Sequence, residues 1–230
     1  MKYHESVLLT ESIEGLNIKP NGIYIDVTYG GGGHSKLILE KLENGKLFAF
    51  DQDDDAVSNL IKDERLVLIQ ENFRFLKKFL RLNGVTKVDG VLADLGVSSH
   101  QFDQADRGFS IRFDGDLDMR MNQNQTLSAK QLINEYELDD LCKIFKLYGE
   151  LNNAYALSKA IISYRENQEI NTTEDLKLAV KSHTPPHKSN KILAQIFQAI
   201  RIEVNDELGA LKDMLTQAVE LLNPNGRLSV

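Results

Sequence analysis

Cysteine is nearly absent from this chain of 230 residues, and long apolar runs are missing as well. The single cysteine, Cys142, lies in DDLCKIF, whose spacing predicts a helix, and one thiol cannot build a disulfide framework. No window approaches the roughly 20 apolar residues of a membrane span, and MKYHESVLLTES lacks the apolar core of a signal peptide. We therefore expect a soluble protein of the reducing cytoplasm.

A surplus of positive charge and the usual metal motifs are also missing. The net charge of −7 argues against indiscriminate binding to a polyanion, although a local basic cluster can still contact RNA. No H-x-x-x-H motif occurs on a helix, and Asp53–Asp55 lack the alternating spacing of a calcium loop, so we expect no metal site. Two basic clusters are candidates for RNA contact, although each alone is more typical of a solvated surface: Lys177, Lys181, His183, His187, Lys188 and Lys191, and Arg107, Arg112 and Arg120.

Strand and helix patterns alternate along the first part of the chain. Apolar β-branched segments are separated by segments of helical period, which predicts βαβ units and a parallel sheet. In such sheets, ligands bind beyond the carboxyl ends of the strands. The expected strands are 23–28, 46–51, 66–70 and 87–94, and the expected helices are 6–16, 34–42, 54–61 and 73–82.

The second half of the chain lacks the alternation of strand and helix patterns. Residues 95–125 predict a long ordered loop, and the pattern from 127 to about 183 is helical. Thr172, with Asp175 three residues on, predicts a capping box. A long helical stretch then follows with a bend near Asn205 or Gly209, and GRLSV predicts the start of a fifth strand. Because no closing strands follow, we expect a fragment.

The glycine-rich segment DVTYGGGGHS is the first candidate site. Gly30–Gly33 follow a strand and precede a helix, so the backbone can approach a ligand closely. Asp26, Asp51 and Asp94 end three of the strands, and carboxylates there suit a cationic ligand such as S-adenosylmethionine better than a pyrophosphate. A nicotinamide cofactor remains the alternative. Asp26 could instead bond the turn's own amides.

Asp94 and the segment after it form the candidate acceptor site. An exocyclic amine on a base is a poor nucleophile, so a hydrogen-bond acceptor must draw on its N–H groups and accept a proton. The Asp94 carboxylate, or backbone carbonyls in the turn after it, can do this. Capping of the loop by Asp94 is the alternative role. Ser98 could donate to substrate or close the turn. Phosphate contact and base stacking are predicted for Arg107, Phe109, Arg112 and Arg120, although aromatic residues at such positions are more often core.

Four segments together resemble the RsmH (MraW) family of bacterial methyltransferases. They are HESVLLTESIEGLNIKPNGIYIDVTYGGGGHS, DLGVSSHQFDQADRGFSIRFDGDLDMRM, YGE at 148–150 and FQAIRIEVNDEL at 197–208. The resemblance implies S-adenosylmethionine-dependent methylation of a cytidine N4 amine in the decoding region of 16S ribosomal RNA. It also implies donor contacts from Gly32, Gly33, His34, Asp51, Phe73, Asp94 and Gln101. The pattern of the glycine-rich segment predicts two further donor-binding residues, Asp26 and Gly30.

The same resemblance implies an architecture and partners. The fold expected is a class I, Rossmann-like parallel sheet that lacks its C-terminal strands. A methyltransferase domain is expected over 1–104 and 200–230, and an inserted helical substrate-recognition domain over 105–199. The expected partner is small-subunit ribosomal RNA within the 30S particle, and a homodimer is left open. The alternatives are a nicotinamide oxidoreductase and a non-catalytic ribosome-assembly factor.

Overall fold

The computed structural model describes residues 7–230 apart from the side chain of Ser99, so His4 and the start of the helix expected over 6–16 lie outside the described residues. The chain forms two compact units, one of Met1–Ser98 with Leu208–Val230 and one of Ser99–Glu207. The second unit is longer than the helical domain expected over 105–199. One reason is that α5 (Ser99–Asp103) packs on the turn Ala105–Arg107, and another is that α10 (Ser189–Asn205) continues past residue 199.

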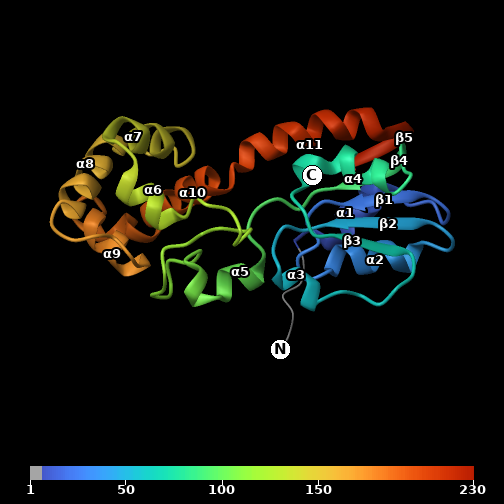
Figure 1. The fold of residues 1–230 in the computed structure, drawn as a ribbon, viewed down its shortest axis with the longest axis horizontal. Helices are drawn as coiled ribbons and strands as arrows, with labels where there is room; N and C mark the ends of the chain where they lie inside the picture. Colours follow the sequence, from blue (N-terminus) through green and yellow to red (C-terminus); the bar gives the residue numbers. More distant parts are fainter. Residues whose placement is uncertain (1–6) are drawn as a thin grey trace. The chain divides into compact units, whose positions relative to one another are not determined.

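The first unit is built on a parallel sheet of five strands in the order β3-β2-β1-β4-β5 (Figure 1). The α/β fold expected from the alternating pattern is therefore confirmed. A fifth strand is present, but it begins earlier than expected, at Leu222, and ends at Ser229, so GRLSV lies at its end and not at its start. This last strand is irregular: Val88 pairs with Leu222 whereas Gly90 pairs with Arg227. The strands are β1 (Ile23–Asp26), β2 (Lys46–Phe50), β3 (Leu66–Ile69), β4 (Val88–Leu92) and β5 (Leu222–Ser229).

Helices cover both faces of this sheet (Figure 1). One face packs Ile25, Phe48 and Phe50 against Leu76 of α4 and Met214 of α11. The opposite face packs Tyr24 and Leu47 against side chains of α1 and α2. Because successive strand residues point to opposite faces, short apolar strands fill both layers. The helices are α1 (Leu9–Leu16), α2 (Gly33–Lys41), α3 (Asp55–Ser58), α4 (Leu76–Leu82) and α11 (Glu207–Leu221).

Two helices of the first unit differ from expectation. The helix expected over 54–61 is the single turn α3, because the Tyr29 hydroxyl donates to the Asn59 carbonyl and accepts from the Ile61 N–H, which holds the chain in a non-helical path. The helix expected over 73–82 begins with a 3₁₀ turn, Phe73–Phe75, before α4.

The second unit is helical, as the pattern after residue 127 predicts. The expected loop 95–125 is wrong in part, because it contains α5 and the 3₁₀ turn Ala105–Arg107. The capping box of Thr172 and Asp175 is present, and Ser128 and Gln131 form another. Asp206, with φ 45°, separates α10 from α11 at the expected bend. The further elements are α6 (Ala129–Glu135), α7 (Leu138–Leu147), α8 (Ala154–Arg165), α9 (Thr173–Val180) and 3₁₀ turns at Lys181–His183 and Pro186–Lys188.

Hydropathy adds one finding on the helices. Within residues 7–230, none of them combines the length and the apolar character that crossing a bilayer requires.

Candidate functional site

The glycine loop between β1 and α2 is a tight turn that only small residues can form. Gly30 and Gly32 have φ values of 50° and 77°, in the left-handed region. A Cβ on Gly32 would lie 2.8 Å from the Tyr29 hydroxyl oxygen. The turn is closed by the Gly32 N–H, which donates to the Tyr29 carbonyl at 2.7 Å. Helix α2 begins directly after it at Gly33, so the amides of its first turn face the same space.

Asp26 at the end of β1 holds this loop from inside. Its side chain is fully buried, and it accepts hydrogen bonds from the Ser35 hydroxyl at 2.7 Å and the Thr28 N–H at 3.1 Å. Burial raises the pKa of the Asp26 carboxyl. These contacts fit the bonding to the turn that the sequence left open, so the Asp26 side chain positions the loop and the start of α2.

Asp51 follows β2 and reaches the same loop from the neighbouring strand. One carboxyl oxygen accepts from the Gly30 N–H at 2.7 Å, and the other accepts from the Asp53 N–H at 3.0 Å. Burial raises the pKa of Asp51 to about 6, and the negative charge of Asp26 contributes in the same direction. The Asp51 carboxylate is therefore ionised above that pH and close to the loop.

Asp94 lies at the end of β4, on the other side of β1. Its backbone N–H donates to the Thr28 hydroxyl at 2.8 Å, and its carboxyl group is exposed. The Asp94 Oδ2 lies 3.8 Å from Nδ1 of His34, a buried residue at the start of α2. The charge of Asp94 contributes to the raised pKa of Asp26. The three predicted aspartates therefore share one rim of the sheet, which we call the acidic rim.

His34 carries an unsatisfied polar atom at this rim. The residue is 4% exposed, and its Nε2 has no hydrogen-bond partner among the described residues. A buried ring nitrogen without a partner costs free energy, and such groups are often retained to bind a ligand.

Ser98 and Phe73 complete the predicted residues of the first unit. A Cβ on Gly30 would lie 3.8 Å from Cβ of Ser98, which places Ser98 beside the loop. Phe73 begins the turn after β3 and is partly buried against the core. Asn72 just before it donates to the side chain of Gln52, one residue after Asp51. Phe73 is thereby tied to the carboxyl end of β2.

The other predicted residues belong to the second unit. Gln101 on α5 is buried. Arg107 is also buried, donates to the Arg120 and Met121 carbonyls, and stacks 5.6 Å from the centre of the buried Phe109 ring. Arg120 pairs with Asp118 at 2.7 Å. Arg107 and Phe109 thus belong to the interior of the unit, and Arg120 is half-buried and held by Asp118.

Arg112 differs from the other two arginines of the predicted set. Its side chain is exposed, and its guanidinium lies 5.3 Å from the centre of the Phe102 ring. Of this set, Arg112 is the one best presented for a phosphate.

Three residues of the rim were not predicted. The Ser35 hydroxyl donates to Asp26, and the Thr28 hydroxyl accepts from the Asp94 N–H. The Tyr29 hydroxyl donates to the Asn59 carbonyl just after α3. A polar residue in the first turn of a helix, facing a buried strand-end aspartate, was the available signal for Ser35. Thr28 and Tyr29 had none, because their partners are backbone groups distant in sequence.

The acidic rim and the glycine loop together define the chemistry that the site favours. Helix N-termini attract anions, but three carboxylates beside one oppose a pyrophosphate and favour a cationic ligand. The exposed carboxyl of Asp94 can accept a proton, whereas the buried carboxyl of Asp26 is bonded to Thr28 and Ser35.

Comparison with known proteins gives the family. The model of the MraW methylase family matches residues 1–230. Ribosomal RNA small subunit methyltransferase H of Christiangramia forsetii is 59% identical over 231 residues, which cover 100% of this chain and 76% of the relative. The protein of the same name from Bacteroides thetaiotaomicron is 50% identical over the same shares. Among solved structures, a putative methyltransferase from Anabaena variabilis aligns with 12% identity and a TM-score of 0.31 over 82% of this chain and 83% of its own. The family match over the whole chain and the high identity of these relatives show that the chain belongs to the MraW methylase family.

Proposed function

We propose that this protein transfers a methyl group from S-adenosylmethionine to small-subunit ribosomal RNA, and that the acceptor is the exocyclic N4 amine of a cytidine. The relatives named above are ribosomal RNA small subunit methyltransferases. The observation that carries the proposal is the acidic rim, where the carboxyls of Asp26, Asp51 and Asp94 gather beside the glycine loop. A nicotinamide dinucleotide is not favoured, because its pyrophosphate would meet these carboxylates.

The residues at the rim fit such a donor, whose sulfonium supplies an electrophilic methyl group. Asp51 has the acceptor oxygens that ribose hydroxyls require, and Phe73 offers an apolar wall for an adenine. The backbone of Gly30, Gly32 and Gly33 allows close approach, and the unpartnered Nε2 of buried His34 can gain a hydrogen bond. Gln101 is assigned to the same donor by the family motif alone.

Asp94 is the proposed catalytic residue. An amine conjugated to a base ring holds its lone pair in the ring, so an acceptor must draw on the N–H groups and then take a proton from the nitrogen. The exposed carboxyl of Asp94 can do this, and it lies 3.8 Å from the imidazole of His34. The cytidine must be unstacked to reach the rim, which favours a folded RNA or the assembling 30S particle as substrate.

The experiment that tests this proposal is transfer of tritium from labelled S-adenosylmethionine to small subunits from a strain that lacks the activity, followed by nucleoside analysis. We expect label in N4-methylcytidine. Label in a different nucleoside would contradict the proposed acceptor. No label in subunits or free RNA would favour a non-catalytic assembly factor.

The cellular context is part of the same proposal. We place the protein in the cytoplasm, where small subunits assemble. Comparing free RNA with 30S particles in the labelling assay identifies the substrate form, and sedimentation of the protein alone tests the homodimer.

A further inference from the structure

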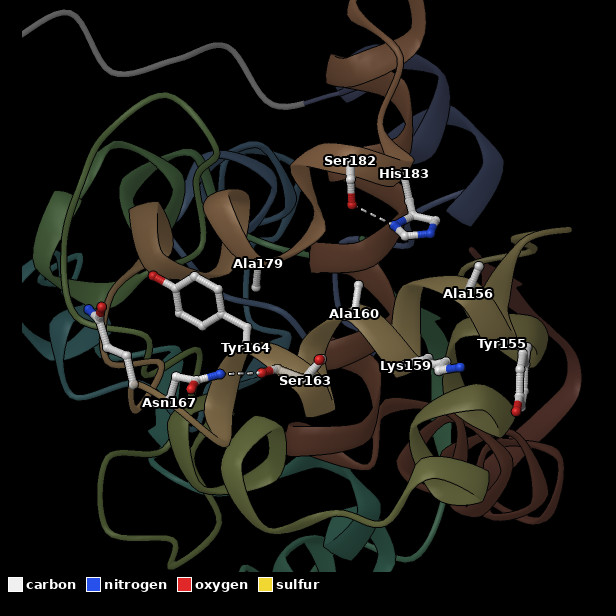
Figure 2. Close-up of a pocket in the computed structure, with 11 residues that line it drawn as sticks. Tyr155, Ala156, Lys159, Ala160, Ser163, Tyr164, Asn167, Ala179, Ser182 and His183 are labelled. Carbon is white, nitrogen blue, oxygen red and sulfur yellow. Dashed lines mark hydrogen bonds between the residues drawn. The ribbon is translucent and has the colours of Figure 1, made fainter.

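The second unit carries a groove between α8 and the segment formed by α9 and the 3₁₀ turn after it (Figure 2). Its volume is about 740 Å³, within the usual range for ligand sites. The lining residues come from these elements and the turn after α8: Tyr155, Ala156, Lys159, Ala160, Ser163, Tyr164, Asn167, Gln168, Ala179, Ser182 and His183.

Small side chains open the groove, and tyrosines mark its length. Ala156, Ala160 and Ser163 follow one another at helical spacing along one face of α8, and Ala179 of α9 lies across from them. Figure 2 shows Tyr164 at one end of this row and Tyr155 at the other. Tyr164 is nine positions after Tyr155, which corresponds to about 13 Å along a helix axis. Tyr155 is 58% exposed, so its ring is free to stack on a ligand.

The charge of the groove is opposite to that of the chain. Acids outnumber Lys and Arg by 34 to 27 in the whole sequence, yet none of the lining residues is an aspartate or glutamate. Lys159 lies within the groove, and the exposed Lys181 adjoins the lining residues Ser182 and His183. The exposed Glu166 and Glu169 adjoin Asn167 and Gln168, so the positive charge belongs to the part of the groove near Lys159 and Lys181. The sequence from 176 to 202 contains no acidic residue. Lys159 and the basic residues of this stretch can attract a polyanion despite the net charge of −7.

We propose that this groove binds a single-stranded segment of the RNA substrate, with Tyr155 and Tyr164 stacking on bases and Lys159 and Lys181 contacting phosphates. The inference rests on the proposed function for the identity of the RNA. Single-stranded RNA is the occupant because aromatic stacking requires unstacked bases, whereas a duplex hides them. Hydroxyl and amide groups of Ser163, Asn167 and Ser182 provide polar partners along the same path.

The test is fluorescence anisotropy with a short fluorescein-labelled single-stranded RNA, measured over a range of salt concentrations. Tyr155→Ala should weaken binding about tenfold, and Tyr155→Phe should keep the affinity because the ring is retained. Lys159→Ala should weaken binding and reduce the slope of log K against log salt by about 0.7, the value for one phosphate contact on a single strand. The matched control is Lys143→Ala, which changes an exposed lysine of α7 outside the groove.

Two outcomes would overturn the inference. One is an unchanged affinity in Tyr155→Ala and Lys159→Ala, together with an equal affinity for the duplex form of the probe. The other is a change in sedimentation of these variants without a change in RNA affinity, which would make the groove a protein interface. The tritium assay on the unmodified protein separates the two proposals, since label in small subunits upholds the function even where the groove variants bind RNA normally.

Discussion

At the residue scale, three aspartates at the ends of neighbouring strands differ in how far water reaches them. Asp26 is fully buried and bonded to the loop, Asp51 is largely enclosed and bonded to two amides, and Asp94 is open. Burial disfavours the charged form of a carboxyl group. We therefore propose that buried Asp26 holds the loop, that Asp51 binds hydroxyls and that open Asp94 accepts a proton. The environment, not the residue type, separates these roles.

Substitution of Asp94 should therefore affect transfer more than donor binding. Asp94→Ala should lower the rate of transfer by about 10² to 10⁴, the usual contribution of a positioned base. Calorimetry should show a smaller loss of donor affinity in Asp94→Ala than in Asp51→Ala. Asp54→Ala, an exposed aspartate after β2, is the control and should change neither quantity. Unchanged turnover in Asp94→Ala would remove this residue from the catalytic role.

The raised pKa of Asp51 predicts a pH dependence of stability. Its pKa is about 6 in the folded chain against an ordinary 3.8, so the folded state binds the proton more tightly. This contribution is fully present below pH 3.8 and is lost as the pH rises through about 6, and it is on the order of 3 kcal/mol. Between pH 4 and 7 the melting temperature of the unmodified protein should fall relative to that of Asp51→Asn. Parallel melting curves of the two proteins would contradict the burial argument.

Gly32 and Gly84 form a matched pair for the glycine loop. Their φ values are 77° and 74°, but a Cβ on Gly32 would meet the Tyr29 hydroxyl at 2.8 Å whereas one on Gly84 meets nothing within 4 Å. Gly84→Ala should cost only the backbone strain, about 1 kcal/mol. Gly32→Ala should lower the melting temperature further and should also weaken donor binding. Equal losses of stability in the two variants would show that the close contact with Tyr29 is not important.

At the scale of elements, a buried asparagine ties α10 to a loop in the second unit. Asn205 accepts from the Met121 N–H at 2.8 Å and donates to the carbonyls of Met119 and Arg201. Asn205→Ala should leave a buried amide unpaired and cost about 1 to 3 kcal/mol. Hydrogen exchange at Met121 should become faster. Asn83→Ala, an exposed residue after α4, should leave that exchange rate unchanged.

The elements also show what a sequence can predict. Strand–helix alternation and the capping box at Thr172 depend on local patterns, and both are confirmed. The short α3 and the helical turns within 95–125 depend on contacts such as those of Tyr29, which local patterns do not contain. For the same reason, the strand-end aspartates could be found from their spacing, and a core position for Phe109 was the alternative that its residue type offered, while the burial of Arg107 could not be found.

At the scale of the whole molecule, charge is distributed unevenly between the two units. The acidic rim belongs to the first unit, and the stretch from 176 to 202 without acidic residues belongs to the second. The basic cluster around Lys181 was visible in the sequence. The groove beside it was not, because it arises where alanines of α8 and α9 face each other. The net charge of −7 therefore averages over an acidic rim in the first unit and a stretch without acidic residues in the second.

The acidic rim as the binding site for a cationic methyl donor is the central claim, and calorimetric titration of the full chain tests it most directly. S-adenosylmethionine should bind, NADH should not, and Asp51→Ala should lose most of the affinity for the donor while it remains folded. Binding of NADH in preference to S-adenosylmethionine, or an Asp51→Ala variant that binds the donor as tightly as the unmodified protein, would contradict the account.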